Sequence, residues 1–540
     1  MTRHAWLKDT LTWTALALAL PLAVRGSAPA AEPTVAGLPG SAAFAHWVGE
    51  FNGADDEIYP HDIPDAASGE FLAANVPLFS CPDREFERTM WFRWWTLRKH
   101  LRRTPDGWVM TEFLPDVPWA GKHNTISCAV MHHIREARWL ADPRFLDDYG
   151  DFWLGKGGAV RSYSCPIADA LWQRRLVTGD QTQVLALLPA LIANYEAWER
   201  DHRAANGLYW QIDDRDGMEV SLGGSGLRAT INSYQFADAT AIAAIAEQAG
   251  KVEVASAFQA RAATLRRLVL AELWNPADAF FEVRPLVDGQ MRPSVGVREL
   301  HGYTPWYVGL AGQEQAVAWG QLMDPQGFFA PCGPTTAERR AKGFALNYSG
   351  HECQWNGPSW PFATAVTLTA LANLLNGPPQ QAIAKQDYFT LLGLYAASQR
   401  RTREDGVVVP WIDEVLNPLT GDWISRTRLK TWKNGTWDAG AGGRERGKDY
   451  NHSAFCDLVI TGLVGLRPRA DATVEVNPLL PEGTWPWFSL DRVPYHGHLL
   501  AIVYDRDGDH FHLGRGLRVY ADGHELAAAP GLSRLTAALP

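Results

Sequence analysis

Two segments of the sequence concentrate acidic residues of the kind that hydrolyse acetals. The first, residues 213–234, carries Asp216 and Glu219 among glycines and arginines, and the second, residues 409–423, carries Glu414. Hydrolysis of a glycosidic bond needs one carboxylic acid that protonates the leaving oxygen and one carboxylate that activates water or attacks the sugar. The acids therefore indicate a two-carboxylate hydrolase as one function for this chain.

A third segment, residues 347–361, supplies groups suited to binding sugars. It contains Trp355 and Trp360, whose flat rings can stack on a sugar face, and the amides of Gln354 and Asn356, which can bond to hydroxyls. Tryptophan is also abundant overall, with 24 copies against 15 tyrosines and 21 phenylalanines. Most of these rings are expected in the core, so this abundance favours a carbohydrate ligand only weakly.

Composition and charge narrow the class of protein. The 540 residues are 46% hydrophobic and 20% charged, which is typical of a packed globular protein and excludes a mainly disordered chain. The formal net charge of -10 gives an acidic surface that repels phosphate backbones. Nucleic acid is therefore not expected as a partner.

The elements that must position these loops are mostly helical. Between about residues 80 and 465, apolar residues recur three and four apart, and Asp, Ser, Pro or Gly marks the ends of the periodic windows. The expected helices span residues 84–102, 125–140, 164–178, 181–200, 233–249, 251–273, 359–376, 383–400 and 450–464. Paired helices in one domain of this size predict a mainly α fold, a closed ring of helical hairpins with its site in loops at one end.

From about residue 466 the pattern changes to short β-rich runs. These runs include residues 473–476, 499–504 and 517–520, and turn signals such as Asp507-Gly508 separate them. We therefore expect a small C-terminal antiparallel β module.

The N-terminus has the three-part layout of a secretory signal peptide. Arg3 and Lys8 precede an apolar run over residues 11–24, and small residues follow at 28–31. The predicted organisation is a signal peptide at 1–31, a lead-in at 32–80, a helical catalytic domain at 81–465 and the β module at 466–540. The mature protein is expected to be periplasmic or secreted and free of the membrane, with its oligomeric state left open.

Three segments resemble signatures of known glycoside hydrolases. Gln354-Trp-Asn-Gly-Pro-Ser-Trp360-Pro361 resembles the tryptophan signature of trehalases, family 37, and the W-x-G-P-x-W segment of family 63 and its mannosylglycerate-hydrolase-like relatives. Residues 216–221 resemble the S-G-x-D-x-S segment that carries the general acid in those families. Residues 414–421 resemble the E-x-Y-N-P-x-T-G segment, whose glutamate is the general base. The three segments also follow one another in the families' order.

The resemblance runs from roughly residue 160 to 465 and implies an (α/α)6 barrel. It also implies an inverting hydrolase of disaccharides or oligosaccharide ends, with Glu219 as general acid and Glu414 as general base. The residues expected to bind the sugar are Arg228, Asn232, Trp355, Asn356, Trp360, Trp411, Asp413, Tyr450 and His452. Neither a catalytic metal nor a cofactor is expected.

Departures from the family pattern leave alternatives open. Glu219 stands where the families use Asp, so Asp216 remains a rival for the acid, and Leu416 replaces the usual Tyr. A helical-barrel polysaccharide lyase would instead use a Tyr or His base, such as Tyr450 or His452. A non-catalytic glycan-binding protein would keep the aromatic residues and not use the carboxylates.

Overall fold

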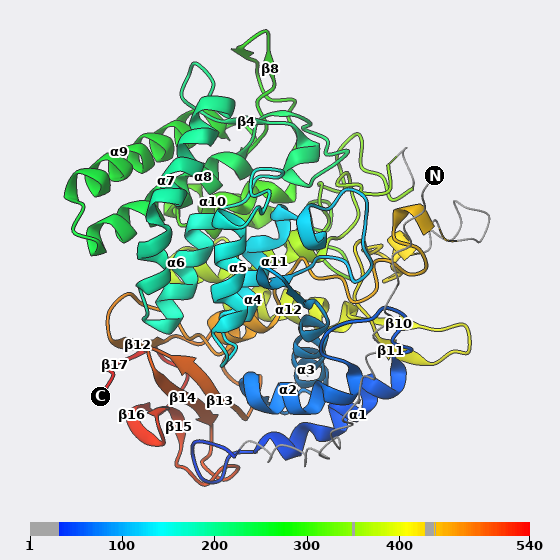
Figure 1. Cartoon of the computed structure of the whole chain (residues 1–540), viewed down its shortest axis with the longest axis vertical. Coiled ribbons are helices and arrows are strands. Elements are labelled where there is room, and N and C mark those ends of the chain that lie inside the picture. Colours follow the sequence, from blue (N-terminus) through cyan, green and yellow to red (C-terminus); the bar gives the residue numbers. More distant parts are fainter. Residues whose placement is uncertain (1–31, 348–350, 427–436, 438) are drawn as a thin grey trace, which may run out of the picture.

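The computed structural model describes residues 32–347, 351–426, 437 and 439–540. The predicted signal peptide at 1–31 lies outside the described residues. The described chain forms a helix-rich body with an antiparallel sheet packed against one side of it (Figure 1). Within the described ranges, no helix combines the length and the apolar character needed to cross a bilayer.

Six helices contact one another in cyclic order: each contacts the next along the chain, and α14 contacts α4. They are α4 (Val130–Ala137), α6 (Ile167–Thr178), α8 (Ala229–Gln248), α10 (Thr304–Tyr307), α11 (Pro361–Asn376) and α14 (Cys456–Leu458). Every residue of α4 is buried, and α8 packs closely because alanines occupy much of its buried surface. These helices form the inner part of the body.

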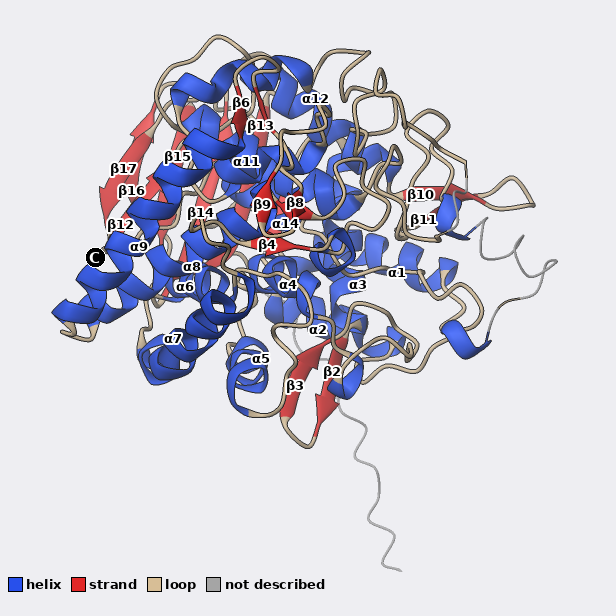
Figure 2. Cartoon of the chain, turned by 90° about the horizontal axis from the view of Figure 1, so that it is seen from above, coloured by secondary structure: helices blue, strands red, loops and turns tan. Residues whose placement is uncertain are grey.

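Longer, partly exposed helices follow several of the inner ones. They are α5 (Arg144–Gly155), α7 (Thr182–His202), α9 (Val252–Leu268) and α12 (Lys385–Ser398). The buried residues of α9 show why such a helix lies outside: they are only Ala255, Phe258, Ala262 and Leu265, three and four residues apart on one face. Figure 2 shows α7, α8 and α9 running side by side.

The tryptophan-rich helix α3 (Arg84–Lys99) belongs to the core. Its N-terminus is capped by Asp83, whose carboxylate accepts the backbone N–H of Glu85 at 3.0 Å and of Phe86 at 3.3 Å. Trp91, Trp94 and Trp95 are all buried. These three rings therefore contribute to the packing of the core.

The lead-in at 32–80 is largely structured. It contains α1 (Ala45–Ala54) and α2 (Ser68–Asn75), which pack on α3, and β1 (Leu78–Ser80). β1 pairs with β13 at one edge of the sheet that the C-terminal region builds. The sheet therefore joins residues from both ends of the described chain.

The C-terminal sheet has the strand order β1-β13-β14-β15-β16, with all neighbours antiparallel. Its C-terminal strands are β13 (Trp487–Tyr495), β14 (His498–Asp505), β15 (Gly516–Ala521) and β16 (His524–Ala529). A separate pair joins β12 (Thr473–Val476) to β17 (Leu535–Ala538). The backbone N–H of His496, in the β13–β14 turn, donates to the carbonyl oxygen of Val177 in α6 at 2.8 Å, which fixes the sheet to the helical body.

Candidate active site

A cavity of about 270 Å³ lies where several loops meet. Most of its lining comes from the loops that precede α4, α6, α8, α11 and α14, and Glu414 follows the short strand β11 (Val408–Pro410). The lining residues with acidic, thiol or aromatic side chains include Glu112, Cys128, Tyr163, Glu219, Cys353, Trp355, Trp360, Glu414, Tyr450 and His452. Residues far apart in the chain thus form one small-molecule-sized site.

Glu219 stands on a loop that the surrounding structure holds tightly. The next residue, Val220, has a φ of 62°, which is unusual for a β-branched residue and marks local backbone strain. Buried Glu299 accepts the backbone N–H groups of Leu222 at 2.7 Å and Gly223 at 3.0 Å. Although burial opposes it, the neighbouring His301 keeps the pKa of Glu299 low, so this carboxylate stays available as an acceptor.

Backbone bonds join the acid, tryptophan and base segments. The N–H of Trp355 donates to the carbonyl oxygen of Glu219 at 3.0 Å. Ser359 and Leu416 exchange two N–H···O=C bonds, each 2.9 Å long. Because these bonds involve the main chain, they fix the relative positions of the three segments independently of side-chain rotamers.

Burial is the largest influence on the pKa values of Glu219 and Glu414. Burial raises the pKa of Glu219 to about 8, and the negative charges of Asp214 and Glu414 act in the same direction. Burial raises the pKa of Glu414 to about 7, and Arg446, 4.0 Å from Glu414 Oε2, acts in the opposite direction. The thiol of Cys353 donates to Glu414 Oε1 at 3.1 Å. The two carboxyls therefore have distinct environments in one cavity.

Glu112 is one of three further acids that line the cavity, with Asp214 and Glu352, and the motifs did not predict it. It is buried and accepts a hydrogen bond from the hydroxyl of Tyr450, while Cys128 Sγ lies 3.9 Å from Glu112 Oε2. Burial raises the pKa of Glu112 to about 8. The only signal in the sequence was an acid within the apolar run Val109-Met-Thr-Glu-Phe-Leu114.

The part of the chain that holds the acid, tryptophan and base segments matches a known family of proteins. Residues 122–453, more than half of the chain, match the mannosylglycerate hydrolase MGH1-like glycoside hydrolase domain. This chain belongs to the MGH1-like glycoside hydrolase family. Residues 466–527 match the C-terminal domain of glycosyl hydrolase family 65.

Solved structures resemble this MGH1-like glycoside hydrolase over most of its length. A chain named sialidase is 43% identical, with a TM-score of 0.85 over 92% of the present chain, which spans only 44% of that chain. The family 78 rhamnosidase of Bacillus sp. GL1 is 15% identical, with a TM-score of 0.52, covering 82% of this chain and 41% of its own. At that identity the rhamnosidase shows a shared fold alone.

Asp216, the rival acid, does not line the cavity of this MGH1-like hydrolase. Its carboxylate is fully buried, 2.6 Å from the Nε of Arg228, and it also accepts the hydroxyl hydrogen bond of Thr230. Arg228 is itself fully buried and donates to the hydroxyl of Ser221 at 3.2 Å. The expectations that Asp216 acts as acid and that Arg228 binds sugar are therefore corrected: the two form an ion pair beneath the acid loop.

Two predicted sugar-binding amides are structural as well. Asn232 is buried, accepts the N–H of Tyr209 at 2.8 Å and donates to the carbonyl oxygens of Tyr209 and Arg228. Asn356 is buried and accepts from Gln354 Nε2 at 3.2 Å. Neither side chain lines the cavity, so their predicted role in sugar binding is corrected.

Trp411 and Asp413 also lie outside the cavity lining. Trp411 lines a separate cavity, and buried Asp413 accepts from the hydroxyl of Ser425 at 2.9 Å and from the indole N–H of Trp411 at 3.3 Å. Asp413 also accepts the backbone N–H of Glu414 at 2.8 Å. The predicted sugar contacts of Trp411 and Asp413 are therefore not found in this cavity. Asp413 instead binds the backbone of Glu414 and helps to position it.

The remaining predicted residues do line the cavity: Trp355, Trp360, Tyr450 and His452. The rings of Trp355 and Trp360 stack with centroids 4.7 Å apart. The indole nitrogen of Trp355 and both ring nitrogens of His452 are buried without a hydrogen-bond partner in the described structure. The two residues thus line the cavity, while these particular nitrogens have no accessible surface in it.

Proposed function

We propose that this glycoside hydrolase cleaves its substrate with inversion, using Glu219 as general acid and Glu414 as general base. The main support is that both glutamates line one cavity and that burial raises the pKa of Glu219 to about 8 and of Glu414 to about 7. A general acid must hold its proton at neutral pH, and a base must be able to lose it. Arg446, which favours ionised Glu414, supports this division of roles.

In the proposed reaction, the carboxylic acid of Glu219 donates its proton to the glycosidic oxygen as the bond to the anomeric carbon breaks. Glu414 removes a proton from a water molecule that attacks the opposite face of that carbon. The thiol of Cys353 donates a hydrogen bond to Glu414. The guanidinium of Arg446 is 2.8 Å from Glu352 and 4.0 Å from Glu414, and its positive charge favours the ionised form of Glu414 before the attack.

We further propose that the substrate is a disaccharide or an oligosaccharide end. The cavity is small, and its inner wall contains the buried residues Glu112 and Tyr450. Trp119, which is 40% exposed, stands at the outer rim. A pocket with a buried end and an exposed rim suits a terminal sugar better than the middle of a long chain.

The helical body is proposed to be an (α/α)6 barrel. The cyclic contacts of α4, α6, α8, α10, α11 and α14, together with partly exposed helices after several of them, support this architecture. The lining loops precede five of these inner helices, which agrees with a site at one end of such a barrel.

Export to the periplasm or the medium remains a proposal based on residues 1–31. Expression of the full chain followed by N-terminal sequencing of the product in periplasmic and culture fractions tests it. A mature N-terminus near residue 31 in either fraction supports export, whereas an intact N-terminus in the cell interior alone contradicts it.

The catalytic proposal is tested by a screen of a glycan library, with the first-formed anomer of the product read by proton NMR. An anomer opposite to that of the substrate supports inversion, and the same anomer contradicts it. An unsaturated product detected by ultraviolet absorbance would instead indicate a lyase. Saturable sugar binding without turnover would indicate a glycan-binding protein.

A further inference from the structure

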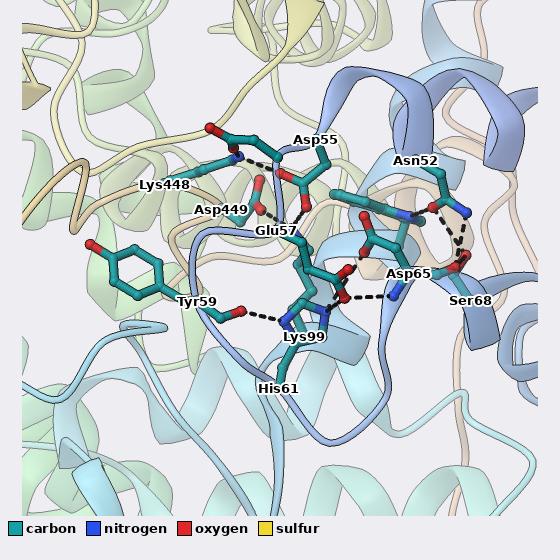
Figure 3. A network of polar contacts seen from close by, with 12 residues as sticks. Asn52, Asp55, Glu57, Tyr59, His61, Asp65, Ser68, Lys99, Lys448 and Asp449 are labelled. Carbon is teal, nitrogen blue, oxygen red and sulfur yellow. Dashed lines mark hydrogen bonds and ion pairs between the residues drawn. The ribbon is translucent and has the colours of Figure 1, made fainter.

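The segment between α1 and α2 brings together three groups that can bind a metal. Figure 3 shows His61 beside Glu57 and Asp65. The Nε2 atom of His61 lies 3.2 Å from Glu57 Oε1 and 3.6 Å from Asp65 Oδ1. One ligating atom from each residue lies within 4.8 Å of the others. None of the three lines the catalytic cavity.

The hydrogen bond at the other ring nitrogen of His61 explains why Nε2 points a lone pair at this cluster. Nδ1 lies 2.9 Å from the carbonyl oxygen of Tyr59, which can only accept, so Nδ1 carries a proton. The side chain of His61 is only 2% exposed, and Nε2 has no hydrogen-bond partner. An acceptor nitrogen therefore faces two carboxylate oxygens, an arrangement that a cation between them would stabilise.

The two separations from His61 Nε2, 3.2 Å to Glu57 and 3.6 Å to Asp65, are close to those around a small divalent cation. Zinc bonds to His nitrogen and carboxylate oxygen are about 2.0–2.2 Å long, which places neighbouring ligands of a tetrahedral site about 3.3–3.6 Å apart. The Nδ1–H bond to a backbone carbonyl is also the usual way in which a metal-binding histidine is oriented. One nitrogen and two oxygen donors leave a fourth position for water.

His61 Nε2 has no hydrogen-bond partner, whereas each carboxylate oxygen that faces it accepts one bond: Glu57 Oε1 accepts the backbone N–H of Asp65 at 2.9 Å, and Asp65 Oδ1 pairs with Arg98. Lys99 contacts Asp55 and lies 2.7 Å from Asp449. Arg98 pairs with Asp65 Oδ1 and also donates to the carbonyl oxygen of Ile63, so it holds Asp65 from the side of α3. The side chain of Glu57 is 40% exposed, which gives an ion access from solvent.

We propose that Glu57, His61 and Asp65 bind one divalent cation of the zinc class, with water as the fourth ligand. Because Asp65 is paired with Arg98 of α3, the ion would fasten the segment between α1 and α2 to the helical body. This role is separate from glycoside hydrolysis.

The test uses the full-length protein, stripped with a chelator and titrated with Zn²⁺ by calorimetry, with bound metal counted after dialysis. One Zn²⁺ per chain is expected, and it should raise the Tm. Glu57→Gln and His61→Gln should bind at least about tenfold more weakly, and their Tm should not respond to zinc. Glu70→Gln, on the exposed face of α2, is the matched control and should behave as wild type.

Two results would overturn the proposal. The first is a wild-type protein that binds no zinc at micromolar free metal, which would leave only the contacts of His61 with the two carboxylates. The second is unchanged binding in both Glu57→Gln and His61→Gln, which would place the zinc elsewhere, for example on the free thiols. Because Glu57 is partly exposed, its Gln variant remains informative even if His61→Gln folds poorly.

Discussion

The backbone N–H of Trp355 donates a 3.0 Å hydrogen bond to the carbonyl oxygen of Glu219. This bond joins the segment that carries the proposed acid to the segment that supplies the stacked tryptophans. The bridge between Ser359 and Leu416 then joins the tryptophan segment to the one that carries Glu414. The three sequence motifs are thus one bonded unit, and Trp355 lines the same cavity as both glutamates.

Substrates with different leaving groups should distinguish the general acid Glu219 from the general base Glu414. Glu219→Gln should lose most activity on alkyl glycosides but keep much of it on aryl glycosides with acidic phenols, because an acidic phenol leaves without protonation. Glu414→Gln should lose activity on both, because water still needs a base. Equal sensitivity of the two variants to the leaving group, measured as kcat/KM across a series of aryl glycosides, would contradict the assignment.

The pH dependence of kcat/KM should be bell-shaped, with its maximum between about pH 7 and 8. Below this range Glu414, with a pKa of about 7, gains a proton and cannot act as base. Above it Glu219, with a pKa of about 8, loses the proton that it must donate. The negative charge of Glu112 raises the pKa of Glu219, so Glu112→Gln should move the alkaline limb to lower pH. An unchanged alkaline limb in that variant would argue against this coupling.

Cys353 is expected to lower the pKa of Glu414, the proposed general base. Its hydrogen bond to Glu414 lowers the pKa of that carboxyl, so Cys353→Ala should raise this pKa and move the acidic limb of the profile to higher pH. Cys332→Ala removes a free thiol that does not line the cavity and serves as the control. If both variants keep the wild-type acidic limb, the thiol does not act on Glu414.

Asp216 should matter for stability, since its charge is buried against Arg228. Asp216→Asn breaks this pair and should lower the free energy of unfolding by about 3–5 kcal/mol. Asp214→Asn, which alters a partly exposed pair with Arg215, should change the free energy of unfolding by no more than about 0.5 kcal/mol. Urea denaturation followed by fluorescence compares them, and equal stabilities would contradict the structural role given to Asp216.

Much of the helical framework could be predicted from apolar spacing. The expected helix at 164–178 appears as Ile167–Thr178 and the one at 359–376 as Pro361–Asn376, because Pro and Gly mark their ends. The helix Arg144–Gly155 was not predicted, although Phe145, Tyr149 and Phe152 show the helical spacing. The strand Trp487–Tyr495 was also missed, since it carries charged residues and a proline, and its pairing with residues 78–80 joins distant parts of the chain.

The site could be predicted only where a motif carried it. Glu219, Glu414 and the tryptophans came from ordered segments, whereas Glu112 stands far from them and enters the cavity only through folding. Asp216 shows the opposite error: its place in an acidic loop favoured catalysis, and only the tertiary contact with Arg228 reveals a structural pair. The local sequence shows which residue types could take part in catalysis. Only the tertiary structure shows which of them line the cavity.

The assignment of Glu219 as acid and Glu414 as base is tested most directly by kcat for Glu219→Gln and Glu414→Gln on the best alkyl glycoside or oligosaccharide found in the screen. Exposed Glu253→Gln on α9 is the control. We expect kcat to fall about 10²–10⁴-fold in each active-site variant, with folding preserved and the control unchanged. Wild-type turnover in either active-site variant would contradict it.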